Sequence, residues 1–159
     1  GKFTDILFHV EKPKESAYKI EGLEVTSTNA STKNAEVKVV KAVDIKVLLA
    51  MGDIAHGEKV FKKCTACHQI AAGGKNMIGP NLWGVIGRTS GSISDYKYSK
   101  AMIAHAKEWS FEEMNSYLIK PQAHIKGTKM AFAGLRKEKD RASVILYLNQ
   151  NSDNPLPLP

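Results

Sequence analysis

The chain has 159 residues, a length suited to one domain with a tail or linker, and 43% of its residues are hydrophobic, as in ordinary soluble globular proteins. No apolar run approaches the length of a membrane-spanning helix. The net charge is +7, and most of it lies in residues 51–159, which contain fifteen basic and nine acidic residues. These basic residues are scattered singly, which argues against a nucleic-acid-binding protein. An anionic surface or an acidic protein partner then remains as the binding partner of a basic protein.

The first 49 residues are predicted to be a linker or extended arm. Residues 1–35 combine a charged, proline-broken stretch with a tract of small polar residues, and neither is able to bury a core. Residues 36–49 are more apolar and partly alternate, which predicts extended structure. A short helix over residues 44–50 fits the same pattern equally well, so both interpretations stand.

Residues 50–151 are predicted to form a compact helical domain, because helix-start signals recur and no strand pattern is present. Ser110 followed three residues later by Glu113 predicts a capped helix start, and Pro121 is predicted to end that helix. Residues 152–159 form a proline-rich tail that cannot be helical. The predicted helices span about residues 53–64, 98–107, 111–119 and 137–149.

The two cysteines occur in the motif Cys64-Thr65-Ala66-Cys67-His68. This is the attachment pattern of a c-type haem, in which both thiols bind the porphyrin edge and the histidine binds the iron. A dithiol redox pair needs neither the histidine nor the loops that follow. A zinc site needs further cysteine or histidine ligands at suitable spacing, and the sequence lacks them. The motif therefore predicts one haem c, bound covalently through the two cysteines.

With these residues identified, the chain resembles the class I cytochromes c of the mitochondrial and alphaproteobacterial branch over about residues 52–150. The resemblance implies an all-α fold whose helices pack around one covalently attached haem, preceded here by a largely non-helical extension. It rests on separate signatures along the chain: Gly57, the cysteine motif, Gly79-Pro80-Asn81-Leu82, Gly87-Arg88, Trp109, Gly127-Thr128-Lys129-Met130 and Tyr147.

The resemblance makes Met130 the second axial iron ligand, opposite His68. The position agrees with a short loop between predicted helices, after Gly127. His124 lies six residues before Met130 and is the only histidine considered as a rival. Four other methionines compete less well, because they lie too close to the histidine, on predicted helices or at the edge of the arm: Met51, Met77, Met102 and Met114.

The resemblance also implies supporting roles around the haem. The Pro80 carbonyl should accept the second ring N–H of His68, and the Tyr117 hydroxyl should lie near the Met130 sulfur. Thr128 should help to hold the methionine loop. The residues expected to serve the buried haem propionates are Arg88, Tyr98 and Trp109.

Four helix and loop positions carry further expectations from the resemblance. Gly57 and Tyr147 should meet where the first and last helices cross, because only a glycine allows so close an approach. Trp83 replaces a histidine that bridges loops in many relatives, so that bridge is not expected here. Met102 replaces an asparagine beside the haem, so the polar contacts there should differ.

A haem with two protein ligands leaves no open position for a substrate, so the resemblance implies a one-electron carrier and not an enzyme. It implies quinol–cytochrome c oxidoreductase as donor and a terminal haem–copper oxidase as acceptor, each meeting the protein through an acidic face. The basic residues expected around the exposed haem edge are Lys63, Lys75, Lys97, Lys120, Lys126, Lys129, Arg136 and Lys137.

Two other functions stay open from the sequence. One is an electron-entry domain of, or donor to, a periplasmic redox enzyme, including a peroxidase type; the other is a gas sensor. A peroxidase or sensor requires that Met130 does not bind the iron.

The chain begins at Gly1, as in a processed or trimmed protein. We expect a monomer in the bacterial periplasm with a membrane tether upstream of residue 1, the mitochondrial intermembrane space being the alternative.

Overall fold

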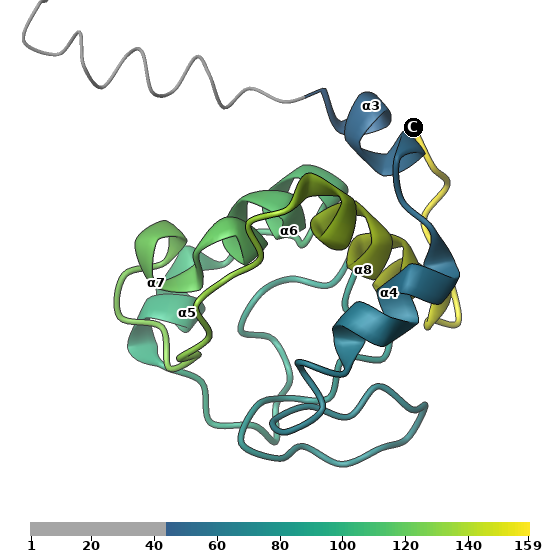
Figure 1. The fold of residues 1–159 in the computed structure, drawn as a ribbon. Helices are drawn as coiled ribbons and strands as arrows, with labels where there is room; N and C mark the ends of the chain where they lie inside the picture. Colours follow the sequence, from purple (N-terminus) through teal and green to yellow (C-terminus); the bar gives the residue numbers. More distant parts are fainter. Residues whose placement is uncertain (1–43) are drawn as a thin grey trace, which may run out of the picture. The chain divides into compact units, whose positions relative to one another are not determined.

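The computed structural model describes residues 44–159, which form one compact unit. The predictions for residues 1–43, including the charged lead and the first part of the arm, lie outside these described residues. Apart from one isolated bridge between Thr89 and Glu108, the described residues contain no β-structure, so the predicted all-α fold is confirmed. Its helices are α3 (Ile45–Ala50), α4 (Ile54–Phe61), α5 (Lys100–His105), α6 (Phe111–Ile119), α7 (Pro121–His124) and α8 (Glu138–Gln150) (Figure 1).

Helix α3 decides between the two interpretations of the residues before the domain. Asp44 caps it by accepting a hydrogen bond from the backbone N–H of Lys46 at 2.9 Å. Leu48 and Leu49 are buried, and α3 packs against α8. The extended interpretation therefore does not hold for residues 45–49, because their two leucines gain burial only when a helical turn places both against α8. Within the described residues, burial against the helical domain thus includes Leu48 and Leu49, before residue 50.

The crossing of α4 and α8 is the most extensive contact between helices in the described residues. Asp53 caps α4, as predicted, by accepting from the backbone N–H of His56 at 3.1 Å. A Cβ atom on Gly57 would lie 2.1 Å from the Ser143 carbonyl oxygen and 2.9 Å from the Tyr147 Cβ. The predicted meeting of Gly57 and Tyr147 is thus confirmed, and the two backbones approach too closely for any side chain at Gly57.

Helices α5, α6 and α7 follow one another along one side of the fold (Figure 1). The Ser110 hydroxyl caps α6, accepting from the backbone N–H of Glu113 at 3.0 Å, and α6 has the predicted bounds. Pro121 does end α6, but it also begins α7, which the sequence did not predict. Proline suits this first helical position because the N–H that it lacks has no partner within a helix there.

The proline-rich tail is non-helical, as predicted, yet it packs onto the domain. Asn149 makes two hydrogen bonds with the backbone of Leu156, each of 2.9 Å, and Leu156 packs against the hydrophobic core. The Trp83 indole N–H donates to the Asp153 carboxylate at 3.2 Å. The side chain that replaces the expected histidine thus binds the tail. Within residues 44–159, no helix has the length and apolar character needed to span a bilayer.

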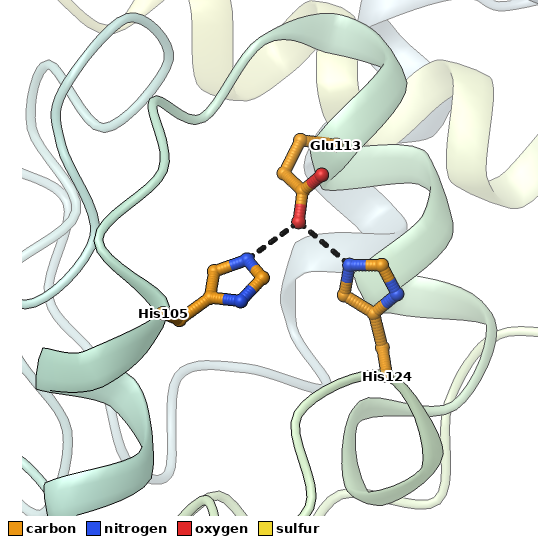
Figure 2. Close-up of side chains that lie close together, drawn as sticks. All are labelled: His105, Glu113 and His124. Atoms are coloured by element: carbon orange, nitrogen blue, oxygen red, sulfur yellow. Dashed lines mark hydrogen bonds and ion pairs between the residues drawn. The ribbon is translucent and has the colours of Figure 1, made fainter.

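A cluster of ionisable side chains joins the three consecutive helices α5, α6 and α7. His105 ends α5 and His124 ends α7, and the Nε2 atom of each lies 2.6 Å from the same carboxylate oxygen, Oε2 of Glu113 in α6 (Figure 2). Burial by itself would raise the pKa of Glu113, but the hydrogen bonds from His124 and His105 outweigh it and the pKa is lowered below 4.5.

This lowered pKa gives Glu113 a pH-dependent share of the stability. A carboxylate whose pKa is lower in the folded state stabilises the fold at pH values above its unfolded pKa, and the contribution disappears as the pH falls through the folded pKa. We expect Glu113→Gln to reduce the free energy of unfolding by about 1–2 kcal/mol at pH 7, since charge-assisted hydrogen bonds are lost. The difference from wild type should shrink progressively below pH 4.5.

Urea unfolding of the holoprotein between pH 3 and 7 measures this difference. Glu112→Gln is the matched control, because Glu112 is an exposed carboxylate in the same first turn of α6. The control should follow wild type at every pH. A gap between Glu113→Gln and wild type that stays constant from pH 7 to pH 3 would contradict the assignment.

Candidate functional site

The domain encloses an apolar cavity of about 450 Å³, within the ~300–1,000 Å³ range of small-molecule and cofactor sites. Its walls come from the end of α4 and the segment after it, from the loops before α5, from α5, α6 and α8, and from the stretch between α7 and α8. The apolar wall residues include Phe61, Leu82, Val85, Trp109, Met114 and Leu118. Every site residue that the sequence predicted lines this cavity: Cys64, Cys67, His68, Pro80, Arg88, Tyr98, Trp109, Tyr117, Thr128 and Met130.

The His68 ring is held with one nitrogen available to a metal. Its Nδ1 lies 2.7 Å from the Pro80 carbonyl oxygen, which only accepts, so Nδ1 carries the proton and Nε2 keeps a free lone pair. Burial lowers the pKa of His68, which keeps the ring neutral. A Cβ on Gly79 would lie 2.3 Å from the His68 Cε1 atom. The absence of a side chain at Gly79 therefore leaves room for the ring.

Cys64 and Cys67 lie in the turns that continue from α4, and both line the cavity. Burial, followed by the proximity of Cys67, raises the pKa of the Cys64 thiol to about 11. A dithiol redox motif requires the opposite, a thiol whose pKa is lowered so that the thiolate forms readily. The environment thus argues against the redox-dithiol interpretation of these cysteines.

The Met130 loop is fixed by a chain of hydrogen bonds. The Tyr117 hydroxyl donates to the Met130 sulfur at 3.4 Å and lies 3.1 Å from the Thr128 hydroxyl. Tyr117 has a single hydroxyl proton, so Thr128 must donate to Tyr117. Gln122 in α7 adds bonds to the Thr128 and Met130 carbonyls, at 3.0 and 2.7 Å. Nothing in the sequence singled out Gln122, because its role depends on how α7 folds over the loop.

Three more of the predicted residues line the cavity: Arg88, Tyr98 and Trp109. Arg88 donates to the Trp83 and Asn81 carbonyls at 3.2 and 3.1 Å, and the Tyr98 hydroxyl accepts from the Ile93 backbone N–H at 3.3 Å. Trp109 lines the same cavity and is buried. The Arg88 guanidinium is thus positioned by two backbone carbonyls.

The side chains considered as alternatives to Met130 differ in whether they line the cavity. The His124 ring is bonded to Glu113 and does not line the cavity, and neither do Met51 and Met77. Met102 and Met114 do line it. Among the methionines of residues 44–159, Met130 alone accepts a hydrogen bond at its sulfur.

The loop bridge that was not expected at Trp83 is made from another position. The Asn76 side-chain amide donates to the Asp95 side chain at 3.2 Å and to the Asp95 carbonyl at 3.4 Å. This bond joins loops that lie 19 residues apart in the sequence. An asparagine between loop residues carries no pattern that reveals such a partner. Met102 lines the cavity, in agreement with the position beside the haem that the resemblance implied for it.

A family model for cytochrome c matches residues 54–152, well over half of the chain. The chain belongs to the cytochrome c family. Curated relatives agree: a cytochrome c homolog of Bradyrhizobium diazoefficiens is 35% identical over 98% of this chain and 84% of that protein. A homolog from Rickettsia prowazekii is 40% identical over 76% of this chain and 69% of its own length. The cytochrome cy protein of Rhodobacter capsulatus is 46% identical over 67% of this chain, and the match spans about half of that protein, 53%.

The solved structure of cytochrome cH from Methylobacterium extorquens is also similar. It superposes with a TM-score of 0.59 and 36% sequence identity, covering 62% of this chain and 99% of that chain. Membership of the family implies covalently bound haem c. The residues present fit this group, because the apolar cavity places two thiols, a neutral imidazole with a free Nε2 lone pair and a thioether along its walls.

Proposed function

We propose that this cytochrome carries single electrons from a quinol–cytochrome c oxidoreductase to a terminal haem–copper oxidase, with His68 and Met130 as the axial iron ligands and Cys64 and Cys67 as the attachment points. The observation that carries the proposal is one apolar cavity with all four of these side chains on its walls. When bound, haem c supplies an iron centre that accepts and donates one electron.

The protein's own contribution is to hold two ligands rigidly. Pro80 fixes the tautomer and the orientation of the His68 ring, which strengthens its donation to a metal. Tyr117, Thr128 and Gln122 hold the Met130 loop. If His68 and Met130 both bind the iron, no coordination position would be left for a substrate or gas, which favours a carrier over a peroxidase or sensor. A neutral thioether ligand also favours the reduced iron, and so raises the reduction potential.

The eight basic residues predicted for the haem edge, the basic rim, favour acidic partners. All eight basic residues predicted for the haem edge are exposed, and Lys63 and Lys129 also line the cavity. Lys129 lies over the Tyr96 ring, 4.8 Å from its centroid, and donates to the Lys97 carbonyl, so its position is defined. Exposed positive charge near a redox centre steers an acidic partner toward it.

The relatives named above are bacterial proteins, and we propose a periplasmic location for this cytochrome. A membrane tether upstream of residue 1 would raise the effective concentration of the cytochrome near its membrane-bound partners. Fractionation of cells that express the full gene tests whether such a tether exists.

Stopped-flow oxidation of the reduced holoprotein by bacterial membranes containing a haem–copper oxidase tests the function. We expect fast oxidation at 10 mM salt and a rate lower by about fivefold or more at 200 mM, since salt screens exposed charges. Lys129→Glu should slow the reaction at low salt. Lys46→Glu, on α3 and outside the basic rim, is the matched control. Slow oxidation, or a rate independent of salt, would overturn the proposed partners.

A further inference from the structure

The cluster of His105, Glu113 and His124 is the feature that electron transfer leaves unexplained. None of the three lines the haem cavity. Their ligand-type atoms, two imidazole nitrogens and a carboxylate oxygen, all lie within 4.8 Å of one another. Figure 2 shows the two rings pointing at the same carboxylate oxygen from opposite sides. Three helices thus present three metal-ligating groups to one small volume.

We propose that His105, Glu113 and His124 form a binding site for a divalent transition-metal ion of the Zn²⁺ type, separate from the haem. Two imidazole nitrogens and one carboxylate oxygen are ligands that Zn²⁺ prefers, and water completes four-coordination in sites with three protein ligands. Oxygen-preferring ions such as Mg²⁺ are disfavoured, because two of the three ligands are imidazoles.

The two histidine rings can replace their hydrogen bonds to Glu113 with bonds to a metal ion. Both Nε2 atoms now face an acceptor oxygen, so each carries a proton. Neither Nδ1 atom has a hydrogen-bond partner among the described residues, so the proton of each neutral ring can occupy Nδ1 and bond to water. Each Nε2 lone pair then points at the place where the ion would lie, beside Oε2 of Glu113.

The spacing requires a small adjustment. The Nε2–Oε2 separations are 2.6 Å, whereas ligands around a tetrahedral ion with bonds of 2.0–2.1 Å lie about 3.3 Å apart. The side chains are partly exposed, at 14% for His105, 15% for Glu113 and 26% for His124. This exposure leaves the rings free to shift outward, gives an ion access from solvent and supplies the fourth, water ligand.

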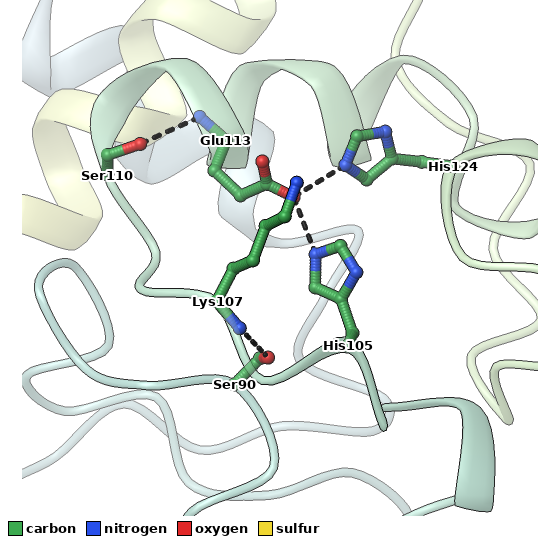
Figure 3. A network of polar contacts seen from close by, with 6 residues as sticks. All are labelled: Ser90, His105, Lys107, Ser110, Glu113 and His124. Atoms are coloured by element: carbon green, nitrogen blue, oxygen red, sulfur yellow. Dashed lines mark hydrogen bonds and ion pairs between the residues drawn. The ribbon is translucent and has the colours of Figure 1, made fainter. Parts of the chain in front are cut away.

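The backbone around the cluster is already held in place (Figure 3). The Ser110 hydroxyl binds the Glu113 backbone N–H at 3.0 Å, and the Ser90 hydroxyl binds the Lys107 backbone N–H at 3.1 Å. Ligands carried on a supported backbone lose less conformational freedom when an ion binds.

Isothermal titration of the holoprotein with Zn²⁺ at pH 7 tests the site. We expect one saturable equivalent, with affinity lower by at least about tenfold in His124→Gln and in Glu113→Gln. His56→Gln is the matched control, because the Nε2 of His56 bonds a single carboxylate, Asp140, at 2.7 Å, and residues 44–159 supply no third ligand there. It should bind Zn²⁺ as wild type does.

A second measurement separates loss of the site from loss of the fold. Excess Zn²⁺ should raise the unfolding temperature of wild type and of His56→Gln, since a ligand that binds only the folded state stabilises it. It should leave that of His124→Gln and Glu113→Gln unchanged, while their visible spectra remain those of the wild-type haem. Absence of saturable binding to wild type at 1 mM Zn²⁺, or equal affinity in wild type and His124→Gln, would overturn the proposal.

Discussion

Replacing Met130 with alanine should abolish the methionine–iron charge-transfer band of the ferric protein and let carbon monoxide bind the reduced form readily. The reason is that Met130 is the proposed ligand carried on a loop and oriented by the Tyr117 hydroxyl. Met102 and Met114 line the same cavity, but they lie in α5 and α6, and within residues 44–159 no hydrogen bond orients the sulfur atom of either one. The reduction potential should fall by on the order of 0.1 V or more, because axial ligands set it over a wide range.

Visible absorption, carbon monoxide titration and redox titration measure the three effects together. Met77→Ala is the matched control, since Met77 is 41% exposed and does not line the cavity. Its spectrum and potential should equal those of wild type. A charge-transfer band that persists in Met130→Ala would show that another side chain binds the iron, and the ligand assignment would fall.

The second large effect concerns stability and not the iron. Gly57→Val should lower the free energy of unfolding by about 3 kcal/mol or more, the upper part of the range for overpacked cores. The added Cβ would lie 2.1 Å from the Ser143 carbonyl oxygen and 2.7 Å from its carbonyl carbon. Both are backbone atoms of α8, so relief requires α4 and α8 to separate along their whole crossing, and not merely a rotamer change.

Urea unfolding of the holoprotein measures the loss. Gly73→Ala is the control for removing a glycine as such. Gly73 has φ of +72°, and a Cβ there meets no atom within 4 Å, so only backbone strain of about 1–2 kcal/mol is expected. Equal losses in Gly57→Val and Gly73→Ala would mean that the helix crossing tolerates a side chain, contrary to the geometry.

The features that the sequence predicted well depend on residues close together in the chain. Asp53 and Ser110 cap helices whose first N–H groups lie within three residues of them, so the starts of α4 and α6 were predictable. The cysteine motif likewise contains its own histidine. Pro121 was a correct helix end, but whether the chain then turns into α7 depends on what α7 packs against. The choice between an arm and a helix at α3 depended on α8 in the same way.

Buried Arg141 shows what the sequence could not supply. Its guanidinium donates to the Asn115 side chain at 2.7 Å and to the Leu135 and Arg136 carbonyls at 2.8 and 2.9 Å, and burial lowers its pKa. These bonds join α8 to α6 and to the segment that leads from the Met130 loop. In the sequence, Arg141 is one basic residue among fifteen in the basic part of the chain. Its partner Asn115 lies 26 positions away.

The sequence by itself determined the helix caps, the haem-attachment motif and membership of an all-α family, because each depends on short-range patterns or on a signature of ordered motifs. Only the tertiary structure decided that Asn76 bridges two loops, that Gln122 holds the Met130 loop and that His105, Glu113 and His124 converge. The physical reason is that a polar side chain satisfies its hydrogen bonds with whichever groups the folded backbone brings within about 3 Å. Those neighbours are set by the packing of α4, α6 and α8, and they leave no periodic trace in the sequence.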